Sequence, residues 1–417
     1  MYTEITKCRI CENDQFETII DLGFQTLTGI FPKNADEKIT TGPLTLVKCS
    51  NTNNPEACGL VQLKHTYENV EMFGQNYGYR SGLNSSMVRH LKDIVNRNLE
   101  FVQLRDNDLV IDIASNDGTL LSFYPKKEVT LVGVDPTSVK FAKYYESHIK
   151  TIGNFFDAEL IEKEFKGKKA RIITSIAMFY DLEQPLKFVQ DIYKVLADDG
   201  IWVFEQSYMP LMIKQNAYDT ICHEHIEYYG LKQVKWLLDK ADFKIIDIEF
   251  NDINGGSFKL TVAKSGSAFS ECFAVINEVL EKEKIYDTRE PFVAFKNNIE
   301  AHKEELFSLL KKLKSENKTV FGYGASTKGN VILQYCGITE EMMPFIAEVN
   351  EDKFGSFTPG TLIPIISETE ARAKKPYCFV VLPWHFRDNI IIREKDTINS
   401  GIKFIFPLPF INIIENV

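Results

Sequence analysis

Residues 109–121, LVIDIASNDGTLL, decide the fold that this sequence predicts. The segment opens with a short apolar run that contains Asp112, and residues 114–118 after it are turn formers. A short apolar strand that ends in such a turn is typical of a parallel α/β sheet, where ligands bind beyond the carboxyl ends of the strands. We expect the apolar residues that follow, at 120–123, to begin a helix.

The composition of this turn favours S-adenosylmethionine (SAM) over a dinucleotide as the ligand. The turn lacks the G-x-G-x-x-G pattern of dinucleotide sites, and the carboxylates of Asp112 and Asp117 would repel a pyrophosphate. A ligand with a sulfonium, an ammonium and no phosphate tolerates them. Asp135 ends the next apolar segment, LVGVD, where a carboxylate can accept hydrogen bonds from both ribose hydroxyls. A generic βαβ unit with capping aspartates is the alternative.

We predict that SAM contacts residues from several loops of this region. They are Asp112, Ala114, Asn116, Asp117, Gly118, Asp135, Pro136, Asn154, Phe155 and Phe156. The two phenylalanines lie where a residue that contacts adenine is expected, although paired phenylalanines are more often part of a core.

Composition and charge restrict the classes of protein to which this chain can belong. With 417 residues, of which 44% are hydrophobic and 25% charged, it should form two or three ordinary soluble domains. A net charge of -10 without a compensating basic stretch disfavours nucleic acid as a partner. The polar N-terminus offers no signal peptide, and no apolar run reaches about 18 residues, so we expect a cytoplasmic protein without a membrane span.

Four of the eight cysteines lie near the N-terminus and predict a zinc site. Cys8 and Cys11 form a C-x2-C pair, whose spacing lets both thiolates reach one tetrahedral ion from a turn, and Cys49 and Cys58 follow with a longer C-x8-C spacing. Disulfides are disfavoured in a reducing cytosol. Four protein ligands leave no open position for a substrate, so the zinc would be structural. Four ordinary thiols are the alternative.

Strands and helices alternate after the opening strand, as expected for a Rossmann-like domain. Apolar segments at 130–135, 171–177 and 200–206 predict strands, and an apolar stripe at helical spacing predicts a helix that ends at Gly200. A second strand, glycine turn and helix are predicted at 319–338, in TVFGYGASTKGNVILQYCGI. The sequence therefore predicts an α/β protein with two Rossmann-like domains and a small zinc-binding N-terminal domain.

Acidic and basic side chains cluster after the fourth predicted strand, in YDTICHEHIEYYG at 218–230. His223 and His225, on either side of Glu224, suit either metal ligation or proton transfer by an imidazole. Their spacing does not match the H-E-x-x-H pattern of hydrolytic zinc sites, and a surface charge cluster is the remaining alternative. The position at the carboxyl end of a strand favours acid–base chemistry.

Polar and basic side chains in several loops predict the binding of an anionic substrate. Tyr77 and Tyr79 lie in a glycine-rich segment, where they could border a substrate cleft or only pack on the next domain. The turn at 324–328 offers hydroxyls and a cation suited to a diphosphate at a helix N-terminus. The predicted substrate contacts are Arg80, Tyr208, Ser257, Gly324, Ser326, Thr327, Lys328, Trp384 and Arg387.

Together these motifs resemble a known family, the three-domain sugar C-methyltransferases that act on nucleotide-linked 4-keto deoxysugars. The resemblance covers essentially the whole chain and rests on the order of its motifs, which are the four cysteines, YGYRSG, IASNDG, the run from Asp219 to His225, GGS at 255–257 and GYGASTKGN. It implies a zinc-binding domain at 1–70, a SAM-binding methyltransferase domain at 71–250 and a Rossmann-like domain for the nucleotide-sugar at 251–417.

The resemblance also implies a reaction, the transfer of a methyl group from SAM to a carbon of a nucleoside diphosphate sugar. Carbon becomes nucleophilic after it loses a proton next to a carbonyl group, so the reaction needs a base and groups that stabilise an enolate. We predict His225 as the base, Glu224 as the group that orients it or binds the sugar, and Tyr77 or Tyr79 as the partner of the enolate or the sugar hydroxyls. The chain could act as a monomer, and its oligomeric state is left open.

One position departs from the family pattern. Enzymes of this family that methylate C-3 tend to have a tyrosine where Cys222 stands, and a thiol is a poorer hydrogen-bond donor. The atom that is methylated is therefore open, and His223 could share the role of base. An O- or N-methyltransferase on a nucleotide-sugar and a non-catalytic zinc protein that binds SAM or a nucleotide are the alternative functions.

Overall fold

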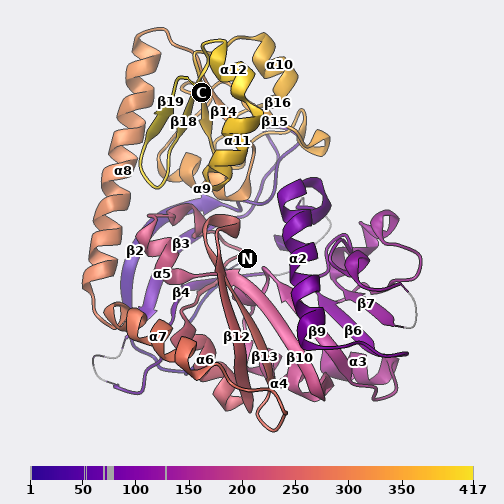
Figure 1. Cartoon of the computed structure of the whole chain (residues 1–417). Helices are drawn as coiled ribbons and strands as arrows, with labels where there is room; N and C mark the ends of the chain where they lie inside the picture. Colours follow the sequence, from indigo (N-terminus) through magenta and orange to yellow (C-terminus); the bar gives the residue numbers. More distant parts are fainter. Residues whose placement is uncertain are drawn as a thin grey trace.

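Two twisted sheets with parallel cores dominate the computed structural model, which describes residues 2–50, 52, 54–68, 71–72, 79–126 and 129–416. Figure 1 shows the middle sheet at the lower right, the C-terminal sheet at the top, and the strands of the N-terminal region beside both of them. The predicted site residue Tyr77 lies outside the described residues.

The middle sheet has the strand order β12-β13-β10-β9-β6-β7-β8. Its strands are β6 (Leu109–Ile113), β7 (Thr130–Val134), β8 (Lys150–Ile152), β9 (Ala170–Ile176), β10 (Leu196–Ser207), β12 (Phe243–Asn251) and β13 (Ser257–Lys264). The strand β13 runs antiparallel to both of its neighbours, β12 and β10, and the other neighbouring strands pair in parallel. Every residue of β6 is buried, as expected for a central strand whose two faces are both covered.

Helices cover this sheet, but not all at the predicted places. They are α2 (Ser85–Phe101), α3 (Ala158–Glu164), α4 (Pro185–Val195) and α6 (Leu231–Lys240), whereas α5 (Met209–Lys214) packs mainly in the core of the N-terminal and C-terminal sheets. The segment after β6 forms only the 3-10 turn η2 (Leu121–Phe123), because Pro125 favours an extended conformation at Tyr124, whose ψ is 156°. Helix α2, which precedes β6, packs its apolar side on the sheet instead.

The predicted end of the helix between β9 and β10 is wrong. The helix α4 stops at Val195, and β10 begins directly with Leu196, five residues earlier than a stop at Gly200 implies. Leu196 pairs with Ala170 of β9, so the chain is already extended there.

The C-terminal sheet has the strand order β16-β15-β14-β17-β18-β19, and only β19 runs antiparallel to its neighbour. Its strands are β14 (Val320–Tyr323), β15 (Ile346–Glu348), β16 (Ile365–Ser367), β17 (Cys378–Val381), β18 (Lys403–Phe406) and β19 (Asn412–Ile414). Its helices are α9 (Thr327–Tyr335), α10 (Glu368–Ala373), α11 (Arg387–Arg393) and α12 (Lys395–Asn399). The predicted strand, glycine turn and helix at 319–338 are β14, Gly324 and α9.

The N-terminal region forms a sheet with the order β11-β4-β3-β2. Its strands are β2 (Phe16–Thr26), β3 (Thr41–Cys49), β4 (Val61–Leu63) and β11 (Glu227–Tyr228), and a separate pair joins β1 (Tyr2–Glu4) to β5 (His65–Tyr67). The strand β11 comes from the sequence of the middle domain and follows His225 almost directly. The N-terminal sheet therefore fixes the backbone of the predicted catalytic segment.

A long helix ties the parts of the molecule together. Helix α8 (Glu290–Ser315) follows α7 (Phe273–Glu283) and runs along one side of the molecule from the middle domain to the C-terminal domain (Figure 1). It contacts both β2 and β14, and one apolar core joins the N-terminal sheet, α5, α8 and the C-terminal sheet. The predicted fold class, two Rossmann-like sheets and a small N-terminal domain, is confirmed.

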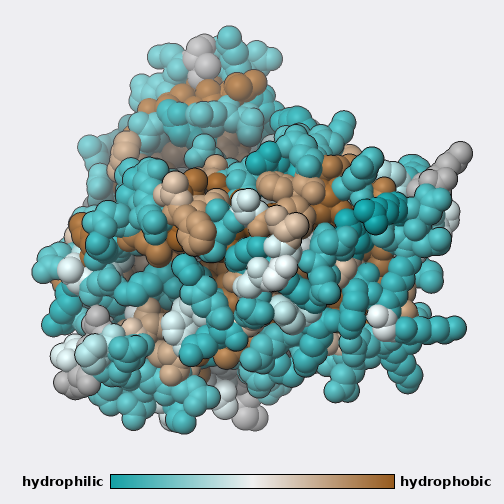
Figure 2. All heavy atoms as spheres, turned by 60° about the horizontal axis from the view of Figure 1, so that its bottom comes forward, coloured by the Kyte–Doolittle hydropathy of each residue, from teal (hydrophilic) through white to brown (hydrophobic). Residues whose placement is uncertain are grey.

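The surface carries the polar and charged side chains that the composition predicts. Figure 2 shows one face, on which hydrophilic residues cover most of the area and apolar residues gather in a broken band across the middle. Among the described residues, no helix combines the length and the apolar character that crossing a membrane requires.

Candidate active site

A cavity of about 900 Å³ lies between the two Rossmann-like sheets. It is lined by the loops that follow β6, β7 and β9 of the middle sheet and by those that follow β14, β15 and β17 of the C-terminal sheet. In each sheet the strand order reverses beside the first strand, β6 or β14, and doubly wound sheets bind ligands at such reversal points. The two reversal points therefore open into one shared space.

The backbone of the middle sheet is strained where it meets the cavity. Ala114 after β6 and Ala177 after β9 both adopt left-handed conformations, with φ of 57° and 55°. Hydrogen bonds to neighbouring strands hold them, from the Ala114 N–H to the Val134 carbonyl (2.8 Å) and from the Ala177 N–H to the Glu205 carbonyl (2.7 Å). Strain of this kind persists where the surroundings fix it, and it clusters at ligand sites.

Two buried carboxyl groups lie at the same edge. Asp135 accepts hydrogen bonds from the N–H groups of Asn116 (2.8 Å) and Thr137 (2.6 Å), so it joins the loops after β6 and β7. Asp112 accepts one from the Thr174 hydroxyl (2.6 Å), and burial, together with Asp135, raises the pKa of Asp112 to about 7. Acidic groups on the cavity wall fit a cationic cofactor such as SAM and disfavour a pyrophosphate.

The residues predicted to approach the adenine also line the cavity, together with Pro136. The side chain of Phe155 is 46% exposed and lines the wall of the cavity. Phe156 belongs to the wall and also packs edge-on against Phe188 of the core, with the ring centroids 5.4 Å apart. Asn154 precedes them on the same wall.

Two of the predicted SAM contacts, Asp117 and Gly118, do not line the cavity. Asn116 and Asp117 accept hydrogen bonds from the N–H groups of residues 81 and 82, at 3.0 and 2.9 Å. Gly118 has φ of 75°, and a Cβ atom there would lie 2.7 Å from the ring of Tyr145. These residues shape the loop and hold the segment at 79–82 against it.

That segment brings Tyr79 and Arg80 to the cavity. The guanidinium of Arg80 lies over the ring of Tyr144, 4.0 Å from its centre, and Arg80 Nε is 3.4 Å from the Asp117 carboxylate. The side chain of Tyr79 is 47% exposed. Both side chains therefore border the space in which a substrate would lie.

His225 lines the cavity from the turn before β11, and its ring packs on that of Tyr180 with centroids 4.3 Å apart. Its Nδ1 lies 3.1 Å from the Thr220 carbonyl oxygen. Because a carbonyl only accepts, Nδ1 carries the proton and Nε2 is left as the acceptor. Burial and the charge of Lys328 lower the pKa of His225 to about 3, so the ring is neutral near pH 7 and able to accept a proton.

Glu224 lies on the opposite side of the backbone turn from His223 and also lines the cavity. Its Oε2 accepts a hydrogen bond from the Thr28 hydroxyl (3.3 Å), and a Cβ atom on Gly29 would lie 2.4 Å from its Oε1. Burial raises the pKa of Glu224 above its ordinary value of 4.5. The segment between β2 and β3 thus closes over this carboxyl group.

His223 points away from the cavity and is fully buried. Its ring meets that of Tyr67 edge-on, with centroids 4.6 Å apart, and neither ring nitrogen has a side-chain partner among the described residues. Burial lowers the pKa of His223 to about 4. The two histidines of the HEH run therefore face different surroundings, and His223 is not placed to take a proton from a ligand in the cavity.

The glycine turn of the C-terminal sheet forms the other wall. Gly324 has φ of 81° and approaches the ring of Pro383, where a Cβ atom would lie 2.7 Å away. Ser326 caps helix α9 by accepting a hydrogen bond from the Gly329 N–H (3.0 Å). Gly324, Ser326 and Thr327 all line the cavity, at a helix N-terminus that suits an anion.

Four residues predicted to contact the substrate do not line the cavity, because each has a partner elsewhere. The Tyr208 hydroxyl donates to the Glu283 carboxylate (2.7 Å), and the Ser257 hydroxyl donates to the Ile253 carbonyl (2.9 Å). The indole N–H of Trp384 donates to the Asp219 carboxylate (2.8 Å). Arg387 is exposed and pairs with its neighbour Asp388 at 3.0 Å.

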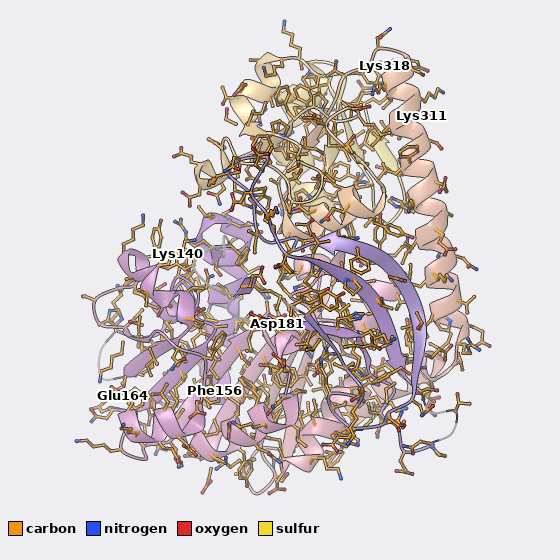
Figure 3. The ribbon with its side chains drawn as sticks, turned by 180° about the vertical axis from the view of Figure 1, so that it is seen from behind. Lys140, Phe156, Glu164, Asp181, Lys311 and Lys318 are labelled. Atoms are coloured by element: carbon orange, nitrogen blue, oxygen red, sulfur yellow. The ribbon has the colours of Figure 1, made fainter. Side chains whose placement is uncertain are left out.

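The structure adds polar residues to the cavity that were absent from our predicted contacts. Asp181 lines it and lies near the centre of the molecule, beside the N-terminal strands (Figure 3). Burial and the nearby Glu224 and Glu227 raise the pKa of Asp181 well above its usual range. Glu205, near the end of β10, and Glu348, the last residue of β15, line the same space. A search for acidic residues at or just after each predicted strand would have found all three.

The four N-terminal cysteines come together away from the cavity. Their sulfur atoms all lie within 4.8 Å of one another, with Cys8 and Cys58 at 3.6 Å and Cys11 and Cys49 at 3.5 Å. Four thiolates around one zinc ion at about 2.3 Å stand about 3.8 Å apart, so the set fits the ion. The Gln62 amide donates to the Cys8 sulfur (3.1 Å), as groups around thiolate ligands do. None of the four lines the cavity, which makes the metal site structural.

Three family models match the chain in consecutive segments. They are a zinc binding domain at residues 8–73, a methyltransferase domain at 83–248 and a C-methyltransferase C-terminal domain at 252–409. The C-methyltransferase NovU of Streptomyces niveus is 28% identical over 416 residues, which cover 99% of this chain and 97% of NovU. The chain therefore carries, in consecutive order, a zinc binding domain, a methyltransferase domain and a C-methyltransferase C-terminal domain. It is a SAM-dependent enzyme with a zinc site, as the sequence predicts.

Other relatives of this methyltransferase match only parts of it. Carboxy-S-adenosyl-L-methionine synthase of Nautilia profundicola is 28% identical over 125 residues, which cover 28% of this chain and 53% of that protein. Among solved structures, an O-methyltransferase family protein from Burkholderia thailandensis is 17% identical with a TM-score of 0.35, covering 48% of this chain and 64% of that one.

Proposed function

We propose that this methyltransferase adds a methyl group to a carbon atom of a nucleoside diphosphate keto sugar. The observation that carries the proposal is the shared cavity, which brings three kinds of group into one space. These are the acidic edge of the SAM domain at Asp112 and Asp135, the neutral imidazole of His225, and the anion-binding helix N-terminus at Ser326 and Thr327.

Each wall has a separate task in this proposal. The residues at Asp112, Asp135 and Phe155 would hold SAM, which supplies an electrophilic methyl group when bound. The N-terminus of α9 would hold the diphosphate through backbone N–H groups and the Thr327 hydroxyl. A sugar between them would lie beside His225, whose Nε2 is unprotonated.

Proton transfer to His225 then creates the nucleophile. The imidazole removes a proton from the carbon next to the carbonyl group, the electron pair moves into the carbon–carbon bond, and the carbonyl oxygen becomes an enolate oxygen. The carboxyl group of Glu224, held by Thr28, is placed to hydrogen-bond a sugar hydroxyl or to position the reacting ring. Tyr79 and Arg80 are available to the hydroxyls and the diphosphate.

A product analysis tests this proposal. The enzyme is incubated with SAM carrying a carbon-13 methyl group and with 4-keto sugars linked to uridine, thymidine, guanosine or cytidine diphosphate. We expect one of them to give a product whose labelled methyl group shows the chemical shift of carbon-bound methyl in NMR. A labelled methyl group at an oxygen shift would instead identify an O-methyltransferase, and no product with any sugar would remove the keto-sugar assignment.

A further inference from the structure

The side chain of Lys328 takes a different direction from the rest of its turn. Ser326 and Thr327 belong to the N-terminus of α9, but the Lys328 ammonium reaches across to the middle domain and donates a hydrogen bond to the carbonyl oxygen of Asn254 (2.7 Å). Asn254 lies in the turn between β12 and β13 and has a left-handed backbone, with φ of 55°. The cation thereby lines the same cavity as His225 and acts electrostatically on its imidazole.

The sequence motif around Asn254 serves this contact. Gly255 and Gly256 follow with φ of 89° and 114°, conformations that other residues rarely adopt. A Cβ atom on Gly256 would lie 2.8 Å from the side chain of Leu211. The glycine pair therefore allows the tight turn that aims the Asn254 carbonyl at Lys328, and it gives the NGGS run a role.

The groups around the Lys328 ammonium are those of the proton-transfer site. Lys328 lines the cavity, and it interacts electrostatically with Asp219, Cys222, His225 and His385. An ammonium has three N–H groups, and Asn254 is its one hydrogen-bond partner among the described residues, so two remain for a ligand. A partly free cation beside a neutral imidazole is a suitable partner for a developing negative charge.

We propose that Lys328 is a catalytic residue, which donates a hydrogen bond to the enolate oxygen while His225 Nε2 removes the proton. This inference rests on the proposed function. The carbon–hydrogen bond breaks, its proton passes to Nε2, its electron pair forms the carbon–carbon double bond, and the carbonyl electrons move to the oxygen at the Lys328 ammonium. The anionic substrate site at Ser326 and Thr327 is then separate from the catalytic cation.

The same charge acts on both products of the proton transfer. Lys328 repels the imidazolium that forms at His225, but it attracts the enolate oxygen, and Coulomb energies fall with distance. An oxygen in hydrogen-bond contact, at about 2.8 Å from the ammonium, is stabilised more than an imidazolium beyond direct contact is destabilised. The lysine therefore lowers the barrier to enolate formation although it makes the free imidazole a weaker base.

The variant Lys328→Met separates this role from binding of the diphosphate. We expect its affinity for uridine or thymidine diphosphate, measured by calorimetry, to stay within about 2-fold of wild type. The exchange of the sugar C–H with deuterium oxide, measured with S-adenosylhomocysteine in place of SAM, should fall by about 100-fold or more, the usual cost of losing one donor to an oxyanion. Loss of diphosphate affinity with unchanged exchange would make Lys328 a phosphate ligand.

Lys353 provides a matched control, because it is a second lysine of the same cavity. Its ammonium donates to the Ala325 carbonyl oxygen (2.7 Å) on the side of the C-terminal sheet. We expect Lys353→Met to reduce the exchange far less than Lys328→Met does. Equal effects of the two variants on the exchange would contradict a special role for Lys328.

A measurement without substrate tests the geometry and keeps the inference separate from the proposed function. In Lys328→Met the pKa of His225, followed by NMR of the carbon-13-labelled ring, should rise from about 3 towards the ordinary value of 6.5, because a repelling charge is gone. An unchanged pKa in a folded variant would show that the ammonium does not act on the base. If this pKa rises but the wild-type enzyme exchanges no sugar proton, the proposed function fails rather than the placement of Lys328.

Discussion

At the scale of the residue, neighbours in the sequence have different roles because burial differs. His225 faces the cavity and keeps one free ring nitrogen, whereas His223, two residues earlier, lies in the N-terminal core against Tyr67. The HEH run alone could not distinguish them, because residues i and i+2 of an extended segment would point to the same side. The chain instead turns here, and the His225 N–H donates to the Cys222 carbonyl (3.1 Å). The N-terminal sheet, which this segment joins at β11, sets that difference.

The burial of His223 predicts a dependence of stability on pH. Its pKa is about 4 in the folded chain and about 6.5 when unfolded, so between these values the unfolded chain binds more protons. Its contribution to stability is fully present above pH 6.5 and is lost as the pH falls to 4, with a limit on the order of 3 kcal/mol. We expect His223→Leu to flatten the pH dependence of urea unfolding in this range.

The same variant tests whether His223 shares the role of base. Because its ring lies outside the cavity, we expect His223→Leu to retain methyl transfer within about 3-fold of wild type once it is folded, by analogy with other substitutions away from reacting groups. A stable variant with less than about 1% of wild-type turnover would instead put His223 in the catalytic machinery.

Some polar residues that were predicted to contact ligands line the cavity, and others do not, for physical reasons. Asp112, Asp135 and the glycine turn of the C-terminal sheet line the cavity because each lies in the last residues of a strand or just after it, at the carboxyl edge of the sheet. Tyr208 and Trp384 also follow strands, but they are held by Glu283 and Asp219, residues 75 and 165 positions away in the sequence. Partners so distant leave no signal in a local pattern.

At the scale of the element, the end of β2 and the segment between β2 and β3 connect the turn that carries Glu224 and His225 to the C-terminal domain. The Thr26 N–H donates to Gln334 of α9 (2.7 Å), Asn330 of α9 donates to the Thr28 carbonyl (2.8 Å), and Gly29 lies against Glu224. A segment of the zinc-binding region thus forms part of the cavity wall. No functional residue was predicted from the sequence in this segment.

A methyl group on Gly29 should disturb this contact. Because the added Cβ would lie 2.4 Å from the Glu224 carboxyl oxygen, Gly29→Ala must displace Glu224 or the segment itself. We expect kcat to fall by about 10-fold or more, since small displacements at a reacting centre are costly, with little change in melting temperature.

Gly266→Ala is the matched control for this substitution. It lies in the turn after β13, and nothing stands within 4 Å of the added Cβ. Wild-type kcat in Gly29→Ala, or an equal loss in both variants, would show that the contact with Glu224 does not matter for turnover.

Removing one cysteine of the zinc cluster should lower the stability of the fold without acting directly on methyl transfer. Cys11→Ser removes one of four ligands, so we expect less than one zinc per chain by elemental analysis and a melting temperature lower by about 6 °C or more, the shift for about 2–3 kcal/mol. Cys272→Ser is the control, because Cys272 lies outside the cluster at the start of α7. Unchanged zinc content and melting in Cys11→Ser would contradict a structural site.

The strands β6, β7, β9, β10 and β14 lie where short apolar runs predicted them, and the wrong predictions around them have physical reasons. The predicted helix after β6 is only a 3-10 turn because Pro125 stops it, and α4 ends at Val195 because the next residue already pairs in the sheet. The strand β11 has two residues and exists only through its pairing with β4. A strand of two residues has no sequence pattern from which it could be predicted.

At the scale of the whole molecule, the candidate active site depends on how the two Rossmann-like sheets face each other. Their reversal points lie more than 200 residues apart in the sequence, at Ala114 and Gly324, and both open into the same cavity. Helix α8 and the core shared with the N-terminal sheet hold this arrangement. Each sheet could be predicted from its own sequence, but their mutual placement depends on these long-range contacts.

The central claim is that His225 makes a carbanion equivalent from a sugar held in this cavity. The most direct measurement follows the exchange of the sugar C–H next to the carbonyl group with deuterium oxide, in wild type and in His225→Asn, with S-adenosylhomocysteine replacing SAM. We expect exchange in the wild type and a loss of about 100-fold or more in the variant, with S-adenosylhomocysteine affinity retained. Exchange that persists unchanged in His225→Asn, or methyl transfer by a wild-type enzyme that exchanges no proton, would contradict the account.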